Sequence, residues 1–121
     1  MRMFGDELRA RRKDLRLGLR EFALRAGVDP GNLSKIERGR LTAPQSDEVL
    51  ERICLALEFE PGSDGAQALK DLAAAETGRI PPEVLDDQEV MVRMPVLLRT
   101  VHNKKLGPEE LDRLIEMIKE A

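Results

Sequence analysis

The sequence predicts an all-α protein, because its apolar residues are aliphatic, recur at helical spacing and are divided by helix-ending residues. The 121 residues include three Phe and no Trp or Tyr, so the core must be built largely from aliphatic side chains. Such a core suits helices better than sheets, since strands favour β-branched and aromatic residues. Gly18, Gly27, Gly39 and Pro61-Gly62 divide the first half of the chain into short segments, as glycine and proline do at helix ends.

Five short helices are expected in the first 76 residues. Their predicted ranges are 3–14, 19–26, 30–38, 47–57 and 64–76. Asp29-Pro30 supplies an N-cap and a first-turn proline for the third helix, and Ser46 supplies an N-cap for the fourth. Gly27 ends the second helix, because glycine tolerates the left-handed conformation found there. We therefore expect an N-terminal domain over 1–76.

A helical appendage over 83–121 is expected after a short linker at 77–82. It contains two amphipathic helices, at about 87–103 and 108–120. Their apolar faces are formed by Val90, Met94, Leu97, Leu98 and Val101, and by Leu111, Leu114, Ile115 and Ile118. Asp86 and Glu89 have the spacing of a capping box, and Pro95 kinks the first of these helices or starts a new one.

The net charge of −3 conceals two halves of opposite sign. Residues 1–40 contain eleven basic and six acidic side chains, a net charge of +5, whereas residues 41–121 carry a net charge of −8. This asymmetry favours a polyanion-binding N-terminal half, although ordinary charged helix faces would give a similar pattern. The choice between the two therefore depends on a motif.

The scarcity of reactive side chains argues against an enzyme. Cys54 is the one cysteine and His102 the one histidine, so no intrachain disulfide can form. The two are far apart in sequence and indicate neither a zinc site nor a nucleophile–base pair, and no metal or cofactor is expected. No apolar run approaches the roughly 20 residues of a membrane span, and the N-terminus lacks the apolar core of a signal peptide. We expect a cytoplasmic protein with no membrane partner.

The spacing within 19–38 predicts a helix-turn-helix. Ala23 provides a small residue where a second helix can cross the first, and Gly27 follows four residues later at the turn. Leu33 and Ile36 then supply apolar positions that hold the second helix against the first. A helical hairpin that merely packs would not need this combination.

These residues carry a resemblance to a known family. The run Leu33-Ser34-Lys35-Ile36-Glu37-Arg38-Gly39 and the preceding Phe22-Ala23 and Ala26-Gly27-Val28 resemble the Xre-type, phage-repressor-like helix-turn-helix proteins. The resemblance covers about residues 4–60. It implies a five-helix DNA-binding domain whose third helix enters the major groove. It also implies a structural ion pair between the first and third helices, which Arg12 and Glu37 match.

The resemblance places the base-facing residues at the start of the third helix. The mapped positions are Pro30, Gly31, Ser34 and Lys35, with Asn32 assisting. Because Pro30 and Gly31 have no side-chain donor, direct readout rests mainly on Lys35, which can pair with guanine O6 and N7. The two small residues also allow close backbone approach and readout of DNA shape.

Four arginines are the expected contacts to DNA phosphates. They are Arg16, Arg20, Arg38 and Arg40. Family members usually carry glutamine at the first position of the second helix, where this sequence has Leu19; Arg20, beside it, is the natural substitute. Each phosphate neutralised by a cation makes DNA binding more salt-dependent.

The leading functional hypothesis is a sequence-specific transcriptional repressor that binds a palindromic operator as a homodimer. One recognition helix reads only a half-site, so the apolar helices of the C-terminal half are assigned to dimerisation. Packing of these helices onto the DNA-binding domain is the simpler alternative. A different function is an antitoxin-type autoregulator, whose C-terminal half would bind a toxin or a protease.

Overall fold

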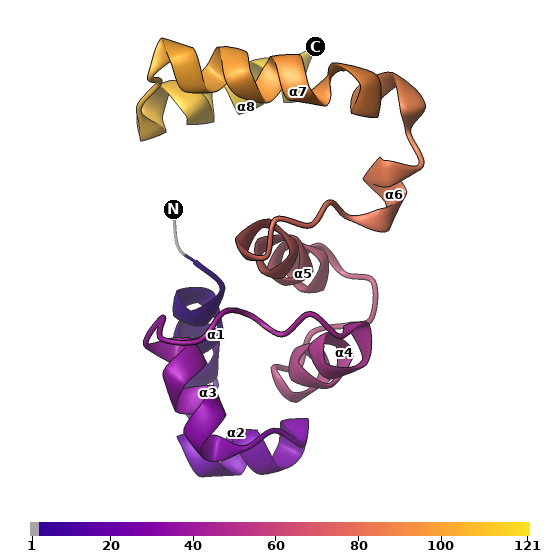
Figure 1. Cartoon of the computed structure of the whole chain (residues 1–121). Coiled ribbons are helices and arrows are strands. Elements are labelled where there is room, and N and C mark those ends of the chain that lie inside the picture. Colours follow the sequence, from indigo (N-terminus) through magenta and orange to yellow (C-terminus); the bar gives the residue numbers. More distant parts are fainter. Residues whose placement is uncertain (1–2) are drawn as a thin grey trace. The chain divides into compact units, whose positions relative to one another are not determined.

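The protein is all-helical, as the sequence predicted. The computed structural model describes residues 3–121, which contain eight α-helices and no strand. The first five are α1 Phe4–Asp14, α2 Leu19–Ala26, α3 Pro30–Glu37, α4 Asp47–Ala56 and α5 Asp64–Glu76. The last three are α6 Pro82–Leu85, α7 Gln88–Lys104 and α8 Pro108–Glu120 (Figure 1). The chain divides into two compact units, one ending at Pro81 and one formed by Pro82–Ala121.

Local signals in the sequence set the limits of the helices in the first unit. Gly27 is left-handed, with φ of 68°, and ends α2. The Asp29 side chain accepts a hydrogen bond from the backbone N–H of Asn32 at 2.9 Å, so α3 begins at the expected cap. Ser46 Oγ accepts from the N–H of Val49 at 3.4 Å and caps α4 in the same way. These three helix boundaries are confirmed.

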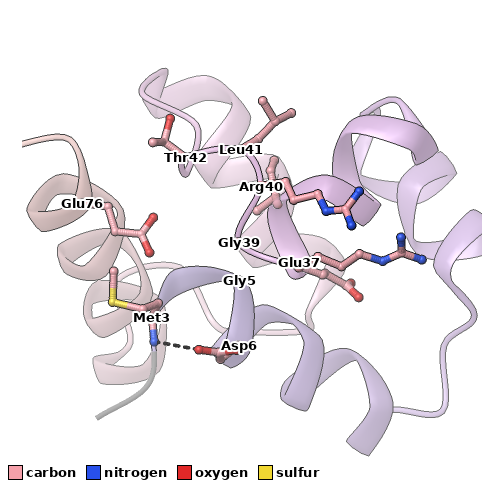
Figure 2. Close-up of a pocket in the computed structure, with 11 residues that line it drawn as sticks. Met3, Gly5, Asp6, Glu37, Gly39, Arg40, Leu41, Thr42 and Glu76 are labelled. Atoms are coloured by element: carbon pink, nitrogen blue, oxygen red, sulfur yellow. Dashed lines mark hydrogen bonds between the residues drawn. The ribbon is translucent and has the colours of Figure 1, made fainter.

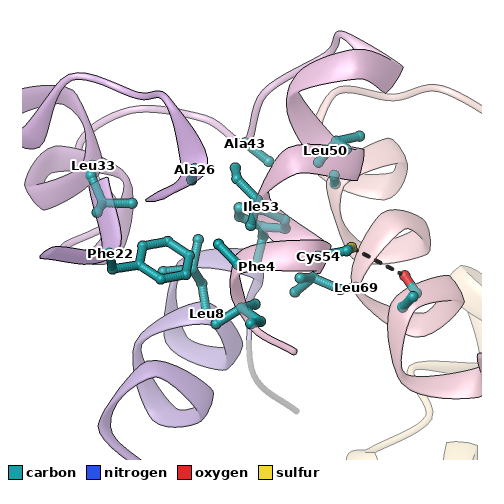
Figure 3. Close-up of a cluster of buried hydrophobic side chains, with 14 of the residues drawn as sticks. Phe4, Leu8, Phe22, Ala26, Leu33, Ala43, Leu50, Ile53, Cys54 and Leu69 are labelled. Carbon is teal, nitrogen blue, oxygen red and sulfur yellow. Dashed lines mark hydrogen bonds between the residues drawn. The ribbon is translucent and has the colours of Figure 1, made fainter. Parts of the chain in front are cut away.

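One hydrophobic core, largely aliphatic but containing two phenylalanines, joins the five helices of the first unit (Figure 3). Phe4 and Leu8 from α1 and Phe22 from α2 are fully buried in it, together with Leu33 from α3 and Ile53 from α4. Leu69 and Ala73 extend the core along α5. Helices α2 and α3 therefore rest on a core to which every helix of the unit contributes.

Gly5 marks a close approach between α1 and α3 that the sequence did not reveal. A Cβ atom at this position would overlap the backbone of Ile36 and Glu37. The start of α1 therefore packs directly on the backbone at the end of α3. A larger residue would force the two helices apart.

The second unit begins one element earlier than expected. Pro82, assigned to the linker, starts the short helix α6, and its carbonyl accepts a hydrogen bond from the N–H of Asp86 at 3.2 Å. Because Asp86 completes this turn, it does not cap α7. Asp87 is the N-cap instead, and its side chain accepts from the N–H of Val90 at 3.2 Å. The prediction that Asp86 and Glu89 form the cap was wrong by one residue.

Helix α7 continues through Pro95 without starting a new helix. Proline cannot donate to the carbonyl four residues earlier, which is that of Met91. Pro95 lies on an exposed part of the helix, where water can satisfy that carbonyl. The option that a new helix begins at Pro95 was therefore wrong.

No residue of 82–121 is buried. Half-buried apolar residues are Val84, Met91, Met94, Val101, Leu106, Leu111 and Leu114. Exposed ones are Leu85, Val90, Val92, Val96, Leu97, Leu98, Ile115, Met117 and Ile118. The unit thus has amphipathic helices but no core of its own. Units of this size often bury enough apolar surface only by oligomerisation.

Candidate nucleic-acid interface

Helix α2, the turn after it and α3 form the helix-turn-helix. Ala23 and Ala26 on α2 and Leu33 on α3 have no exposed surface, so Leu33 of α3 is buried together with two small residues of α2. The N–H of Val28 donates to the Ala23 carbonyl at 3.0 Å and closes the turn. Arg52 on α4 donates from Nε to the Ala26 carbonyl at 3.1 Å, which satisfies an open carbonyl at the end of α2.

The two sides of α3 have different roles. Leu33 and Glu37 are buried and Ile36 is half-buried, so this side holds the helix to the domain. Of the predicted base-facing positions, four are exposed and one is half-buried. The exposed ones are Pro30, Gly31, Asn32 and Lys35, and the half-buried one is Ser34. The side chains proposed to read bases therefore take little part in packing.

An ion pair between Arg12 and Glu37 fixes the end of α3 against α1. Arg12 Nε lies 2.7 Å from Glu37 Oε2, and Arg12 Nη2 lies 2.8 Å from Glu37 Oε1, a bidentate arrangement. Arg12 Nη1 also donates to the Leu17 carbonyl at 2.8 Å. The hydrogen bonding that Arg12 donates to Glu37 raises the pKa of Arg12, against the opposing effect of burial. The guanidinium, carried by α1, thus has partners on α3 and on the segment before α2.

Among the described residues, some cations of this unit are paired with carboxylates and others are not. Arg25 is held by Glu21 and Arg52 by Glu48, each across one helical turn. The predicted DNA-contacting cations are different, because each is exposed and none has a side-chain partner among residues 3–121. They are Arg16, Arg20, Lys35, Arg38 and Arg40. These charges are available to an external anion.

The first position of α2 serves packing instead of phosphate contact. Leu19 is half-buried and lies against the core. Arg20 follows it and is exposed in the first turn of α2, where helix N–H groups also favour an anion. Arg16 precedes this turn and adopts a left-handed backbone conformation, with φ of 59°.

The comparison with protein families agrees with this geometry. A family model described as a helix-turn-helix domain matches residues 3–64, just over half the chain. The chain belongs to the helix-turn-helix domain family. This helix-turn-helix domain indicates a DNA-binding regulator, and its family is typically non-enzymatic. No curated protein and no solved structure matches the chain.

The described residues contain neither a metal-binding cluster nor a membrane-spanning helix. Residues 3–121 contain no group of three or more His, Cys, Asp or Glu side chains arranged to hold a metal ion. In the same range, no helix is both long and apolar enough to cross a membrane. Cys54 is buried, and burial raises the pKa of its thiol.

A pocket of about 390 Å³ lies beside the C-terminal end of α3 in the helix-turn-helix domain (Figure 2). It is lined by Met3, Gly5, Asp6, residues 36–42 and Glu76. Glu76 comes from α5 and lies opposite the loop that carries Arg40. Sequence reasoning missed Glu76, because its contacts are to residues 72 and 33 positions away.

Proposed function

We propose that this protein is a sequence-specific transcriptional repressor that binds a palindromic or pseudopalindromic operator as a homodimer. The observation that carries the proposal is the exposed side of α3, together with nearby exposed cations that have no side-chain partner within residues 3–121. Phosphate contacts from such cations give affinity and register, and side chains at the start of α3 give base discrimination. Two copies read two half-sites about one helical turn apart.

Selection of bound sites from a random DNA pool tests this proposal directly. The expected result is an enriched motif with two-fold symmetry and half-sites centred about 10 base pairs apart. Enrichment of a single half-site would support DNA reading without a dimer. Recovery of no motif, at salt concentrations where control repressors select theirs, would contradict sequence-specific binding.

Lys35→Ala should reduce discrimination between the selected site and a site mutated at one guanine. Lys35 is the exposed side chain at the reading positions that can pair with guanine O6 and N7, and such a contact is worth about 1–3 kcal/mol. Competition binding with the two duplexes measures the ratio of the affinities for the selected and the mutated site. Lys13→Ala removes an equal charge from α1 and should leave the ratio unchanged. Equal loss of discrimination in both variants would rule out base readout by Lys35.

Arg40→Ala should weaken binding to all sequences alike. Arg40 is exposed in the loop after α3 and has no side-chain partner among the described residues, so we assign it to a phosphate. Loss of one such contact should make the slope of log Kd against log salt shallower by about 0.9. Fluorescence anisotropy over a salt series measures this slope. Arg25→Ala, which removes a charge already paired with Glu21, is the control, and an equal change in both would refute the assignment.

The unburied helices α7 and α8 support the proposed dimer. Of the nine apolar residues expected at the interface, five are exposed and four are half-buried. The exposed ones are Val90, Leu97, Leu98, Ile115 and Ile118; the half-buried ones are Met94, Val101, Leu111 and Leu114. Helix α7 carries three basic and one acidic residue besides its histidine, whereas α8 carries five acidic and two basic residues. A second copy therefore offers both apolar surface and an opposite charge to each helix.

The antitoxin-type alternative assigns the same apolar surface to a different protein. In that case DNA binding would autoregulate an operon, and a toxin or protease would cover α7 and α8. A toxic product of the adjacent gene that co-purifies with the full chain, but not with a chain ending at Pro81, would favour this function. A purified chain that dimerises through α7 and α8 would favour the repressor.

A further inference from the structure

The loop over residues 38–46 carries two of the proposed phosphate contacts, Arg38 and Arg40. Its first residues are held by the end of α3, because the N–H groups of Arg40 and Leu41 donate to the Lys35 carbonyl at 2.8 and 3.3 Å. Beyond that point the loop borders the pocket beside α3 (Figure 2). Its position there depends on how the far end of the loop is fastened.

Two side chains fasten that far end: Glu76, the last residue of α5, and Arg79, which lies three residues beyond it. Glu76 accepts two backbone hydrogen bonds, one from Phe4 N–H to Oε1 at 3.0 Å and one from Ala43 N–H to Oε2 at 3.2 Å. Arg79 donates from Nη1 to the Gln45 carbonyl at 2.7 Å. One carboxylate thus joins α1, α5 and the loop, and a nearby guanidinium holds the loop two residues further on.

We propose that Glu76 and Arg79 are positioning residues for DNA backbone contact, acting through the loop that carries Arg38 and Arg40. This inference rests on the proposed DNA-binding function. Both residues lie outside the matched helix-turn-helix domain, which ends at residue 64. Because they hold the loop in one conformation, less conformational entropy is lost when the arginines bind phosphate.

The substitution Glu76→Gln distinguishes this positioning role from simple electrostatics, because the two predict opposite changes in DNA affinity. Removing a negative charge from a DNA-binding surface should strengthen binding to a polyanion. Phe4 and Ala43 donate to different oxygens of Glu76, and glutamine puts an NH2 group, which cannot accept, in place of one of them. Positioning therefore predicts weaker binding, by about three- to tenfold, as expected for partial loss of a charge-assisted contact.

Arg79→Lys provides a second variant that keeps the charge and changes only an exposed contact. Lysine lacks the planar fork of arginine and holds a carbonyl less rigidly, so binding should again weaken. Glu60→Gln, at an exposed position between α4 and α5, is the matched control for Glu76 and should bind as the parent protein does. Anisotropy titrations use the duplex obtained by selection, well below the unfolding temperature found by circular dichroism.

Repeating both substitutions in an Arg38→Ala/Arg40→Ala background tests whether they act through the loop. Positioning predicts that neither substitution weakens binding further once the two arginines are absent. Unchanged or tighter binding by folded Glu76→Gln together with parental binding by Arg79→Lys would overturn the proposal, as would equal losses in both backgrounds. If the parent protein selects no DNA, it is the proposed function that fails.

Discussion

Glu37→Ala is expected to lower the free energy of unfolding by about 3–5 kcal/mol, because it leaves Arg12 buried and unpaired. The Arg12 and Glu37 side chains are 10% and 5% exposed, so water cannot replace the lost partner easily. A loss of this size is a large part of the stability of a small domain. Urea denaturation followed by far-ultraviolet circular dichroism measures it, since the chain has no Trp or Tyr.

Two further variants define what the Glu37 result means. Glu21→Ala removes a surface partner of Arg25, a pair whose side chains are 49% and 53% exposed, and should cost no more than about 1 kcal/mol. Arg12→Met combined with Glu37→Leu should recover much of the loss, since an apolar pair leaves no charge unpaired. A loss below 1 kcal/mol for Glu37→Ala would show that the ion pair does not hold α3 in place.

Leu98→Gln combined with Ile118→Gln is expected to convert the proposed dimer into a monomer. These residues are 61% and 68% exposed in the single chain, so their replacement should leave the fold of the monomer unchanged. Loss of the dimer should weaken binding to the operator with two half-sites by about 100-fold or more. In the dimer, binding of one domain holds the second domain at a high effective concentration near the other half-site, and a monomer lacks this effect. Sedimentation velocity and operator titration measure the two effects.

The control for this variant is Asn103→Gln, an exposed polar change on α7 that should leave the dimer intact. Binding to an isolated half-site should be equal in all three proteins, because α2 and α3 are untouched. A parent protein that is monomeric at micromolar concentration would contradict the homodimer. A glutamine variant that remains dimeric would place the interface elsewhere.

Signals that act over a few residues made most of the fold predictable. The positions of Gly27, Asp29 and Ser46 fix helix ends through backbone conformation and capping, which involve neighbours in sequence. The apolar spacing at Ala23 and Leu33 similarly identified the crossing of α2 and α3. The N-cap Asp87 was missed because the adjacent Asp86 is an equally suitable capping residue by sequence. The turn of α6 makes the choice, since it includes Asp86 and leaves Asp87 to cap α7.

Features that depend on distant segments could not be predicted in this way. The need for glycine at position 5 arises from the backbone of Ile36, which no local pattern contains. The contacts of Glu76 join α5 to α1 and to the loop after α3, and an isolated glutamate in a helix gives no sign of them. Of the candidate site, the residues on α3 followed from sequence, whereas the groups that hold α3 and its loop required the fold.

The division of α3 into a buried and an exposed side has a consequence for the divergence of this protein. Leu33 and Glu37 hold the helix in place, whereas Pro30, Gly31 and Lys35 are exposed. Substitutions on the exposed side can therefore accumulate with little loss of stability, since surface changes are usually close to neutral. Under the proposed function, duplicated copies of such a gene would acquire separate DNA sequence preferences while keeping the same scaffold.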